Sequence, residues 1–329
     1  MIEKIGLFFG GMSNENQVSI SSAKNIIKNI DTSKYSLVLI YRHLDGNFYK
    51  INDTQEISNV KEENKIIDDF KNYFDKALLM THGKYGEDGI LQGILELEKI
   101  PYCGCRVLSS ALCMDKGVFK TFLQGQNINQ TKFISLDTKL LSKKGLETTI
   151  ENIKKTFELP IYIKPCNSGS SVGITRIGSF DEIKDAIDLA SKHDSKIIIE
   201  QGITNPHEIE VAVLGNDKLI VSQPGELVLA KDFYDYDDKY NLNEAKINIP
   251  ANLTQEQIQK IQTLASNIYK LCDCRGFARV DFFVSQGNIY LNEINTLPGF
   301  TDISMFPMLM NHMGIGFKEL ISKIIELGY

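Results

Sequence analysis

Short apolar runs, each followed by a glycine-containing polar loop, recur along the first hundred residues. Residues 5–9 and 77–80 are two such runs, and helical periodicity follows them at about 18–30 and 90–99. Apolar runs of four to eight residues bounded by turn residues are typical of buried strands. Strand, glycine-rich loop and helix in this order predict a doubly wound α/β sheet whose ligand crevice lies at the carboxyl ends of the strands.

The middle of the chain continues with alternating helical and extended patterns. Helices are predicted at 116–124 and within 145–157, and strands at 132–135, 159–164 and 197–203. Mixed strands and helices that continue past the first sheet indicate a further α/β lobe.

A run of small residues follows the strand that ends at Lys164. Residues 166–173 contain three serines and two glycines. Successive backbone N–H groups in such a loop can surround phosphate oxygens, and Lys164 would add positive charge. The same composition is equally compatible with a hairpin tip that carries an ordinary surface lysine. The pattern G-x₄-G-K-[ST] is absent, so a P-loop is excluded.

The last third has the strongest pattern, a helix followed by a hairpin. Residues 254–257 have the form of a capping box and open a helix with one apolar stripe. Two runs rich in aromatic and β-branched residues, 276–284 and 289–295, flank a turn that contains Gly287. Such a pair of runs predicts a β-hairpin.

Polar side chains share one face of this predicted hairpin. Because side chains alternate between faces along a strand, Arg279 lies on the same face as Asp281, and Glu293 on the same face as Asn295. A turn centred near Gly287 places Asp281 opposite Glu293, within one residue.

Two carboxylates at opposed strand positions repel each other, so a positive group is expected between them. Carboxylate and amide oxygens without nearby Cys or His are ligands that suit Mg²⁺. The alternative is a solvent-facing polar stripe. The loop Thr296–Gly299, which ends strand pairing directly after this set, favours the metal site.

Composition narrows the class of protein. The chain has 329 residues, 43% of them hydrophobic, and a net charge of −6, values that are ordinary for a globular enzyme and argue against non-specific nucleic-acid binding. No stretch approaches the roughly 20 apolar residues of a membrane span, and the N-terminus does not resemble a signal peptide. Six cysteines without C-x₂-C spacing predict reduced thiols in a cytoplasm rather than zinc ligands.

Seven motifs occur in one order along the chain. They are Gly10-Gly11-Met12-Ser13-Asn14-Glu15, His82-Gly83 with Gly86-Glu87-Asp88-Gly89, Met114-Asp115-Lys116, Lys164-Pro165 with Gly169-Ser170-Ser171-Val172-Gly173, Tyr234-Asp235-Tyr236 with Lys239-Tyr240, Arg279-Val280-Asp281, and Glu293-Ile294-Asn295-Thr296-Leu297-Pro298-Gly299. This ordered set, which spans nearly the whole chain, resembles the D-alanine–D-alanine ligases, a family within the ATP-grasp superfamily.

The resemblance implies an α/β ATP-grasp fold with three lobes, the first built on a Rossmann-like parallel sheet. We expect an N-terminal substrate-binding lobe at 1–105, a central ATP-grasp lobe at 106–203 and a C-terminal catalytic and metal-binding lobe at 204–329. It also implies ATP-dependent joining of two D-alanines through an acyl phosphate for peptidoglycan precursor synthesis. A cytoplasmic homodimer with small-molecule substrates, but without nucleic-acid or membrane partners, is the expected assembly.

The resemblance further implies roles for individual residues. Two Mg²⁺ ions, for which Mn²⁺ can substitute, would be held by Asp281, Glu293 and Asn295. ATP would be bound by Lys116, Lys164, Ser168, Ser171, Glu200, Gln201, Ile203, Glu208 and Lys239. The first D-alanine would meet Glu15 and His82, the second would meet Ser304, and catalysis would depend on Glu15, Ser170, Tyr240, Arg279 and Gly299.

Two alternatives remain open from the sequence. One is an ATP-grasp ligase that takes D-serine or D-lactate as second substrate, although Lys239 and Tyr240 match the dipeptide-forming branch. The other is a nucleotide-binding protein without catalysis, against which the intact metal set argues. Two departures from the family are Gln17, where an acidic residue is usual, and a longer polar segment at 45–75.

Overall fold

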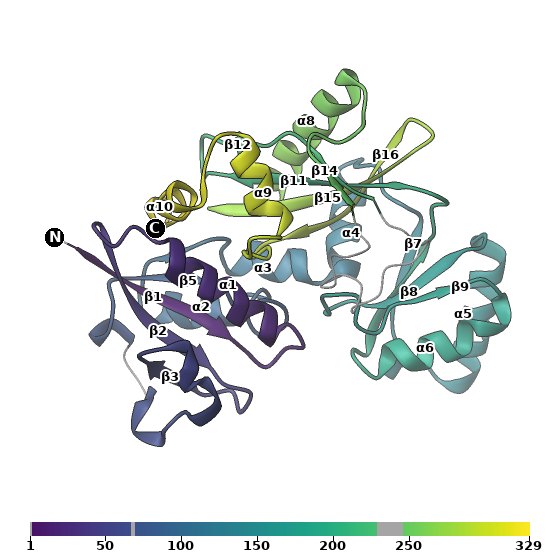
Figure 1. The fold of residues 1–329 in the computed structure, drawn as a ribbon. Coiled ribbons are helices and arrows are strands. Elements are labelled where there is room, and N and C mark those ends of the chain that lie inside the picture. The colour runs from purple at the N-terminus through teal and green to yellow at the C-terminus, as the bar shows by residue number, and fades with distance from the viewer. Residues whose placement is uncertain (1, 67–69, 229–245) are drawn as a thin grey trace.

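The computed structural model describes residues 2–66, 70–228 and 246–329. Within these residues the chain forms three β-sheets with helices packed against them (Figure 1). The predicted mixed α/β class is confirmed, and the predicted helices and strands correspond to elements of the structure.

The N-terminal sheet has the strand order β4-β3-β2-β1-β5-β6. Its strands are β1 (Glu3–Gly10), β2 (Tyr35–Arg42), β3 (Phe48–Ile51), β4 (Lys65–Ile66), β5 (Lys76–Leu79) and β6 (Tyr102–Cys103). Strands β2, β1, β5 and β6 run parallel. The polar segment 45–75 supplies β3 and β4, which extend the sheet antiparallel at one edge. The helices of this part are α1 (Asn16–Asn29) and α2 (Ile90–Leu97), with 3₁₀ turns at Thr54–Asn59, Glu62–Asn64 and Phe70–Asn72.

The central sheet is antiparallel, with the order β7-β10-β8-β9. Its strands are β7 (Phe133–Asp137), β8 (Ile161–Pro165), β9 (Thr175–Ile177) and β10 (Lys196–Gln201), and its helices are α5 (Lys143–Thr156) and α6 (Ile183–Ser191), with 3₁₀ turns at Thr138–Leu140 and Phe180–Glu182. Side chains of α5 and α6 form one core with those of the sheet. The opposite side of the sheet therefore stays available for the cleft described below.

The third sheet has the order β14-β13-β11-β15-β16, with β12 paired to β11. Its strands are β11 (His207–Leu214), β12 (Ile220–Val221), β13 (Gly225–Val228), β14 (Lys246–Asn248), β15 (Phe277–Ser285) and β16 (Asn288–Asn295). The helices α8 (Gln255–Leu271), α9 (Met305–His312) and α10 (Phe317–Glu326) belong to the same stretch of chain. The predicted capping box at Thr254 and Gln257 is present at the start of α8.

Two helices precede the central sheet in sequence, but their buried apolar side chains belong to another core. Helices α3 (Val107–Met114) and α4 (Lys116–Gln124) contribute Cys113 and Phe119 to the core beneath β11 and β15. Helices α9 and α10 in turn share the core of the N-terminal sheet. The three sheets are thus joined by helices that cross between them, and the expected boundaries at 105/106 and 203/204 stay predictions.

The hairpin β15–β16 has the predicted register. Asp281 pairs directly with Glu293, and Arg279 pairs with Asn295. The two-residue turn consists of Gln286 and Gly287, both with positive φ (50° and 80°), as a turn that matches the twist of its strands requires. The turn sets the register from Ser285 to Phe282, and a β-bulge between Phe282 and Asp281 shifts it by one residue. Turn and bulge together therefore place Asp281 opposite Glu293 and Arg279 opposite Asn295.

Candidate functional site

A cleft of about 520 Å³ lies where the three sheets approach one another. Its lining draws on α1, on the loop after β8, on β10 and on the β15–β16 hairpin. The predicted site residues that line it are Glu15, Lys116, Lys164, Ser168, Ser170, Ser171, Glu200, Gln201, Ile203, Glu208, Glu293 and Asn295. Residues predicted from motifs that lie up to 280 positions apart are therefore brought together in one cavity.

Arg279 is the positive group beside the hairpin carboxylates. It donates to both oxygens of Asp281, through Nε at 2.8 Å and Nη2 at 2.7 Å, and forms an ion pair with Glu210 at 2.9 Å. Asn295 donates to Asp281 at 2.8 Å. Burial alone would lower the pKa of Arg279, but the charges of Asp281 and Glu210 outweigh it and raise that pKa above its ordinary value. Arg279 therefore stays charged at any physiological pH.

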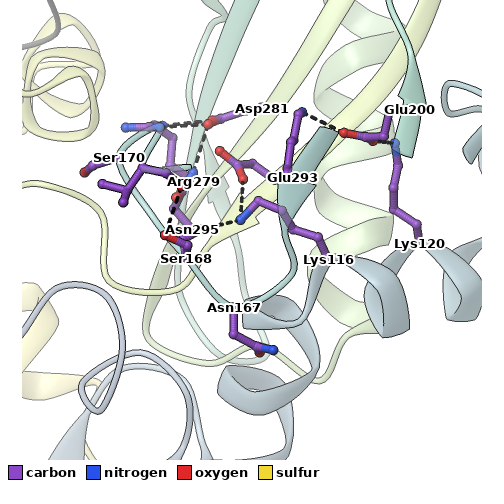
Figure 2. A network of polar contacts seen from close by, with 12 residues as sticks. Lys116, Lys120, Asn167, Ser168, Ser170, Glu200, Arg279, Asp281, Glu293 and Asn295 are labelled. Carbon is purple, nitrogen blue, oxygen red and sulfur yellow. Dashed lines mark hydrogen bonds and ion pairs between the residues drawn. The ribbon is translucent and has the colours of Figure 1, made fainter. Parts of the chain in front are cut away.

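Glu293 faces the cleft from the opposite strand position (Figure 2). Lys116 Nζ lies 3.5 Å from its carboxylate and also donates to the backbone oxygen of Ser168 at 2.8 Å. Lys116 consequently connects the acidic hairpin to the serine-rich loop. This position between a carboxylate and a candidate phosphate-binding loop suits a cation that meets nucleotide phosphates.

The hairpin set has the donor chemistry of a magnesium site. Asp281, Glu293 and Asn295 present carboxylate and amide oxygens, the hard ligands that Mg²⁺ takes together with water and phosphates. Among the described residues, no cluster of three or more His, Cys, Asp and Glu side chains has a metal-binding arrangement. The set therefore fits an ion that a nucleotide helps to hold, rather than an all-protein metal cage.

A second charge cluster joins α4, β8 and β10. Glu200 is buried and forms ion pairs with Lys120 and with Lys164, the latter at 2.6 Å. Lys120 also donates to Thr131 at 3.0 Å. Burial would raise the pKa of Glu200, but the two lysine charges outweigh it and hold that pKa well below its usual range.

Lys120 was missed in the sequence analysis, as was Glu210. Helical spacing indicated only that Lys120 lies on α4, and alternation indicated only that Glu210 lies on a strand. Their partners Glu200 and Arg279 are 80 and 69 positions away in sequence. Lys120 lies among the buried residues of α4, and a charged residue on the apolar side of a helix is a signal that could have found it. Glu210 alternates with the buried Ile209 and Val211, so the pattern of β11 gives no such signal.

Replacing Glu200 by glutamine is expected to destabilise the protein. It leaves two buried lysines without a carboxylate, and removal of one partner from a buried ion pair costs about 3–5 kcal/mol. Since the pKa of Glu200 is lowered on folding, its contribution is complete above the unfolded value of about 4.3 and is lost as pH falls below it. Urea unfolding of both proteins at pH 7 measures the first effect. A series for the wild type from pH 7 down to about pH 2 measures the second, because most of the loss falls well below the unfolded pKa. Glu151→Gln, which removes an exposed pair with Lys154, is the control and should change stability by less than about 1 kcal/mol.

The serine-rich loop after β8 contacts the N-terminal helix. Ser170 donates a hydrogen bond to the carboxylate of Glu15, so two residues to which the resemblance gives catalytic roles are in direct contact. Ser170 and Ser171 both have positive φ (49° and 59°), a conformation that costs non-glycine residues about 1–3 kcal/mol and clusters at functional sites. A Cβ atom at Gly169 would lie 2.6 Å from Glu15, so only glycine allows this approach.

His82, which is buried, and Glu87, which is half-buried, lie close to Glu15. The ring nitrogens of His82 lie 2.9 Å from Ser22 Oγ and 2.8 Å from the backbone oxygen of Leu297. Burial lowers the pKa of His82, although the charge of Glu15 opposes this. Burial and the charge of Glu15 raise the pKa of Glu87 to about 8, and its carboxyl accepts from the backbone N–H groups of Gly83 and Leu297.

The remaining predicted residues lie at the edges of the site. Gly299 and Ser304 are neighbours, because a Cβ atom at Gly299 would lie 2.9 Å from Ser304 Oγ. Ser304 accepts a hydrogen bond from the N–H of Thr301 at 3.0 Å. Lys239 and Tyr240 lie outside the described residues.

Comparisons with known proteins identify the family of the chain. Residues 4–105 match the family domain described as D-ala D-ala ligase N-terminus, and residues 122–326 match D-ala D-ala ligase C-terminus. The D-alanine--D-alanine ligase of Clostridium acetobutylicum is 41% identical over 338 residues, covering 99% of this chain and 98% of the relative. No helix among the described residues is long and apolar enough to cross a bilayer.

Solved structures of ligases of this kind have a similar fold. The VanG D-Ala:D-Ser ligase from Enterococcus faecalis aligns with a TM-score of 0.87 at 36% identity, covering 99% of both chains. The D-alanine-D-alanine ligase from Coxiella burnetii aligns with a TM-score of 0.85 at 31% identity, covering 99% of this chain and 93% of that chain. With two family domains and near-complete coverage, this three-sheet chain has the ATP-grasp fold and belongs to the D-alanine–D-alanine ligase family.

Proposed function

We propose that the chain joins two D-alanines to D-alanyl-D-alanine with ATP, releasing ADP and phosphate, for peptidoglycan precursor synthesis. The observation that carries this proposal is the arrangement of one cleft. The Glu15–Ser170 link, the Lys116–Glu293 pair and the acidic hairpin all open into it. An amine-binding carboxylate, phosphate-binding cations and metal ligands are the groups that carboxylate activation by ATP requires.

The nucleotide end of the cleft is assigned to the central sheet and β11. Lys116, Lys164, Ser168 and Ser171 would bind the phosphates, and Lys239, outside the described residues, the γ-phosphate. Glu200 with the backbone of Gln201 and Ile203 would meet the adenine, and Glu208 the ribose. Two Mg²⁺ ions, or Mn²⁺, would be held by Asp281, Glu293 and Asn295 and would supply charge neutralisation during phosphoryl transfer.

The amino-acid end is assigned to α1, the loop after β5 and the loop after β16. Glu15, supported by His82, would bind the ammonium of the first D-alanine, and Ser304 the carboxylate of the second. The first carboxylate attacks the γ-phosphate to give an acyl phosphate, and the second amine displaces phosphate. Arg279 and the N–H of Gly299 would stabilise the oxyanion that forms in this step.

Closure of the site would protect the acyl phosphate from water. The Glu15–Ser170 hydrogen bond joins α1 to the central sheet, and Tyr240 would extend this link to the third lobe. Three lobes at 1–105, 106–203 and 204–329, a homodimer and a cytoplasmic location complete the proposal.

The identity of the second substrate is tested by phosphate release. With ATP and Mg²⁺, D-alanine alone should support sustained release, whereas L-alanine should give only background. Addition of D-serine or D-lactate to limiting D-alanine should not increase the rate or yield mixed products. A faster reaction with D-serine would instead favour the activity named for the Enterococcus faecalis neighbour, and no release with any amino acid would favour a non-catalytic nucleotide-binding protein.

A further inference from the structure

The loop between β16 and α9 is held from both sides by the N-terminal part of the chain. This loop, residues 297–300, contains Gly299. The residues that hold it are Ser22 and Asn25 on α1 and His82 and Glu87 after β5, and we name this group the loop clamp. Except for Glu87, each side chain of the clamp is at least nine-tenths buried.

Four hydrogen bonds define the loop clamp. At Leu297, the backbone N–H donates to Glu87 at 3.0 Å and the carbonyl accepts from His82 Nδ1 at 2.8 Å. At Phe300, the backbone N–H donates to Ser22 Oγ at 3.1 Å and the carbonyl accepts from Asn25 Nδ2 at 3.0 Å. Both backbone groups of the residues that bracket Pro298 and Gly299 are therefore fixed.

The hydrogen-bond directions in the clamp follow from its donors. Because the Phe300 N–H donates to Ser22 Oγ, the Ser22 hydroxyl proton is available to donate to His82 Nε2, 2.9 Å away. His82 then carries its proton on Nδ1 and donates it to the carbonyl of Leu297. Asn29 donates to Asn25 Oδ1 at 2.9 Å, which turns the amide nitrogen of Asn25 toward Phe300. Every donor in the clamp is thus matched to an acceptor.

The sequence of α1 contains a signal for this arrangement. Asn16, Ser19, Ser22 and Asn25 follow one another at three-residue spacing and are all buried, where a helix normally presents apolar side chains. Asn16 and Ser19 bind backbone groups of Gly11, Gly10 and Met80. Ser22 and Asn25 instead form hydrogen bonds to Phe300, about 275 residues away in sequence. Their polar side chains therefore hold that loop against α1.

We propose that Ser22 and Asn25 are positioning residues that aim the Gly299 N–H at the reacting carbonyl. Pro298 fixes one backbone angle of the loop, so clamping Leu297 and Phe300 leaves the Gly299 peptide little freedom. Glu15 immediately precedes the same helix, and α1 therefore sets the distance between the ammonium site and the oxyanion donor. The role rests on the proposed ligase activity.

The kinetic test uses Asn25→Leu and Ser22→Ala, each of which removes one hydrogen bond to Phe300. Ser22→Ala also removes the hydrogen bond to His82, so the KM for D-alanine is read from Asn25→Leu. An oxyanion donor acts mainly in the transition state, so kcat should fall while the KM for D-alanine and ATP stays nearly constant. Misplacement of a reacting group by about 1 Å costs up to about 100-fold, and we expect a loss of about 10- to 100-fold. Ser22→Thr, which keeps the hydroxyl, should restore much of the rate.

Two controls separate positioning from stability. Ser322→Ala removes another buried helical hydroxyl, one that bonds within α10, and should leave kcat unchanged. A dipeptide analogue with a tetrahedral phosphinate in place of the peptide bond resembles the transition state. Its affinity for Ser22→Ala should be lower than for the wild type by the same factor as kcat. If Ser22 had only a structural role, Ser22→Ala would lower the thermal midpoint but leave kcat per folded enzyme and the affinity for the phosphinate unchanged. That result would overturn the proposal.

Hydrogen exchange of the backbone amides of Leu297, Gly299 and Phe300 tests the clamp independently of activity. In Ser22→Ala these amides should exchange faster than in the wild type and in Ser322→Ala. Unchanged exchange would show that the clamp does not hold the loop, and faster exchange with unchanged kcat would show that it does not position the oxyanion donor. A wild-type chain without ligase activity would overturn the proposed function, and with it the oxyanion role, while the exchange result would still report on the clamp.

Discussion

Replacing Glu293 by glutamine is expected to lower kcat by about 10³-fold or more while the protein remains folded. Glu293 is the cleft-facing carboxylate of the hairpin, paired with Asp281 and approached by Lys116. Glutamine keeps the size of the side chain but removes the charge that would hold the metal ions. A loss of about 4 kcal/mol of transition-state stabilisation corresponds to this factor.

Phosphate release at saturating ATP, Mg²⁺ and D-alanine measures this prediction. Thermal unfolding provides a second readout, because a ligand that binds the folded state raises its stability. In the wild type, Mg²⁺ and a non-hydrolysable ATP analogue together should raise the thermal unfolding midpoint. This increase should disappear in Glu293→Gln. Glu319→Gln, which loses an exposed pair with Lys323, is the matched control. Wild-type turnover in Glu293→Gln would refute the metal assignment.

Replacing Arg279 by alanine is expected to damage both stability and catalysis. The guanidinium holds Asp281 through two hydrogen bonds and Glu210 through an ion pair. Its removal leaves two largely buried carboxylates side by side, which costs about 3–5 kcal/mol. Loss of an oxyanion donor lowers kcat by about 10²–10³-fold in addition.

Arg279→Lys separates these two effects. Lysine keeps the charge but has no planar fork for Asp281, so the stability loss should be smaller while kcat stays low. Arg275→Ala is the control, since Arg275 makes two longer, partly exposed ion pairs and should cost less than about 1 kcal/mol. Urea unfolding and steady-state kinetics give the two quantities. An active Arg279→Ala variant would contradict the catalytic role, whatever its stability.

The pattern of apolar and polar residues predicted most helices and strands of the structure, and it predicted that the polar side chains of the β15–β16 hairpin lie together. Alternation and the position of the turn predicted Asp281 opposite Glu293 within one residue, and the structure pairs the two. A β-bulge between Asp281 and Phe282, which alternation does not predict, sets the final register. The segment 45–75 shows the limit of such patterns. Strand β3 is antiparallel to β2, and β4 is antiparallel to β3. With four and two residues, both strands are too short to give a comparable signal.

Charge partners from distant segments could not be predicted in the same way. The resemblance implies that Glu200 meets the adenine and Lys164 the phosphates, whereas in the structure Glu200 also forms ion pairs with Lys164 and Lys120. Nothing within a helical turn of Lys120 indicates that its side chain turns toward β10. Only the packing of α4 against that strand decides this pairing.

The sequence by itself determined the kinds of residue available, their order, and the faces of the strands and helices on which they lie. These properties depend on the backbone period of each element and on turns of a few residues. The tertiary structure alone decided which faces meet: Glu15 with Ser170, Glu200 with two lysines, and Ser22 with Phe300. The physical reason is that these contacts depend on burial and on close approach of segments far apart in the chain, which no local period encodes.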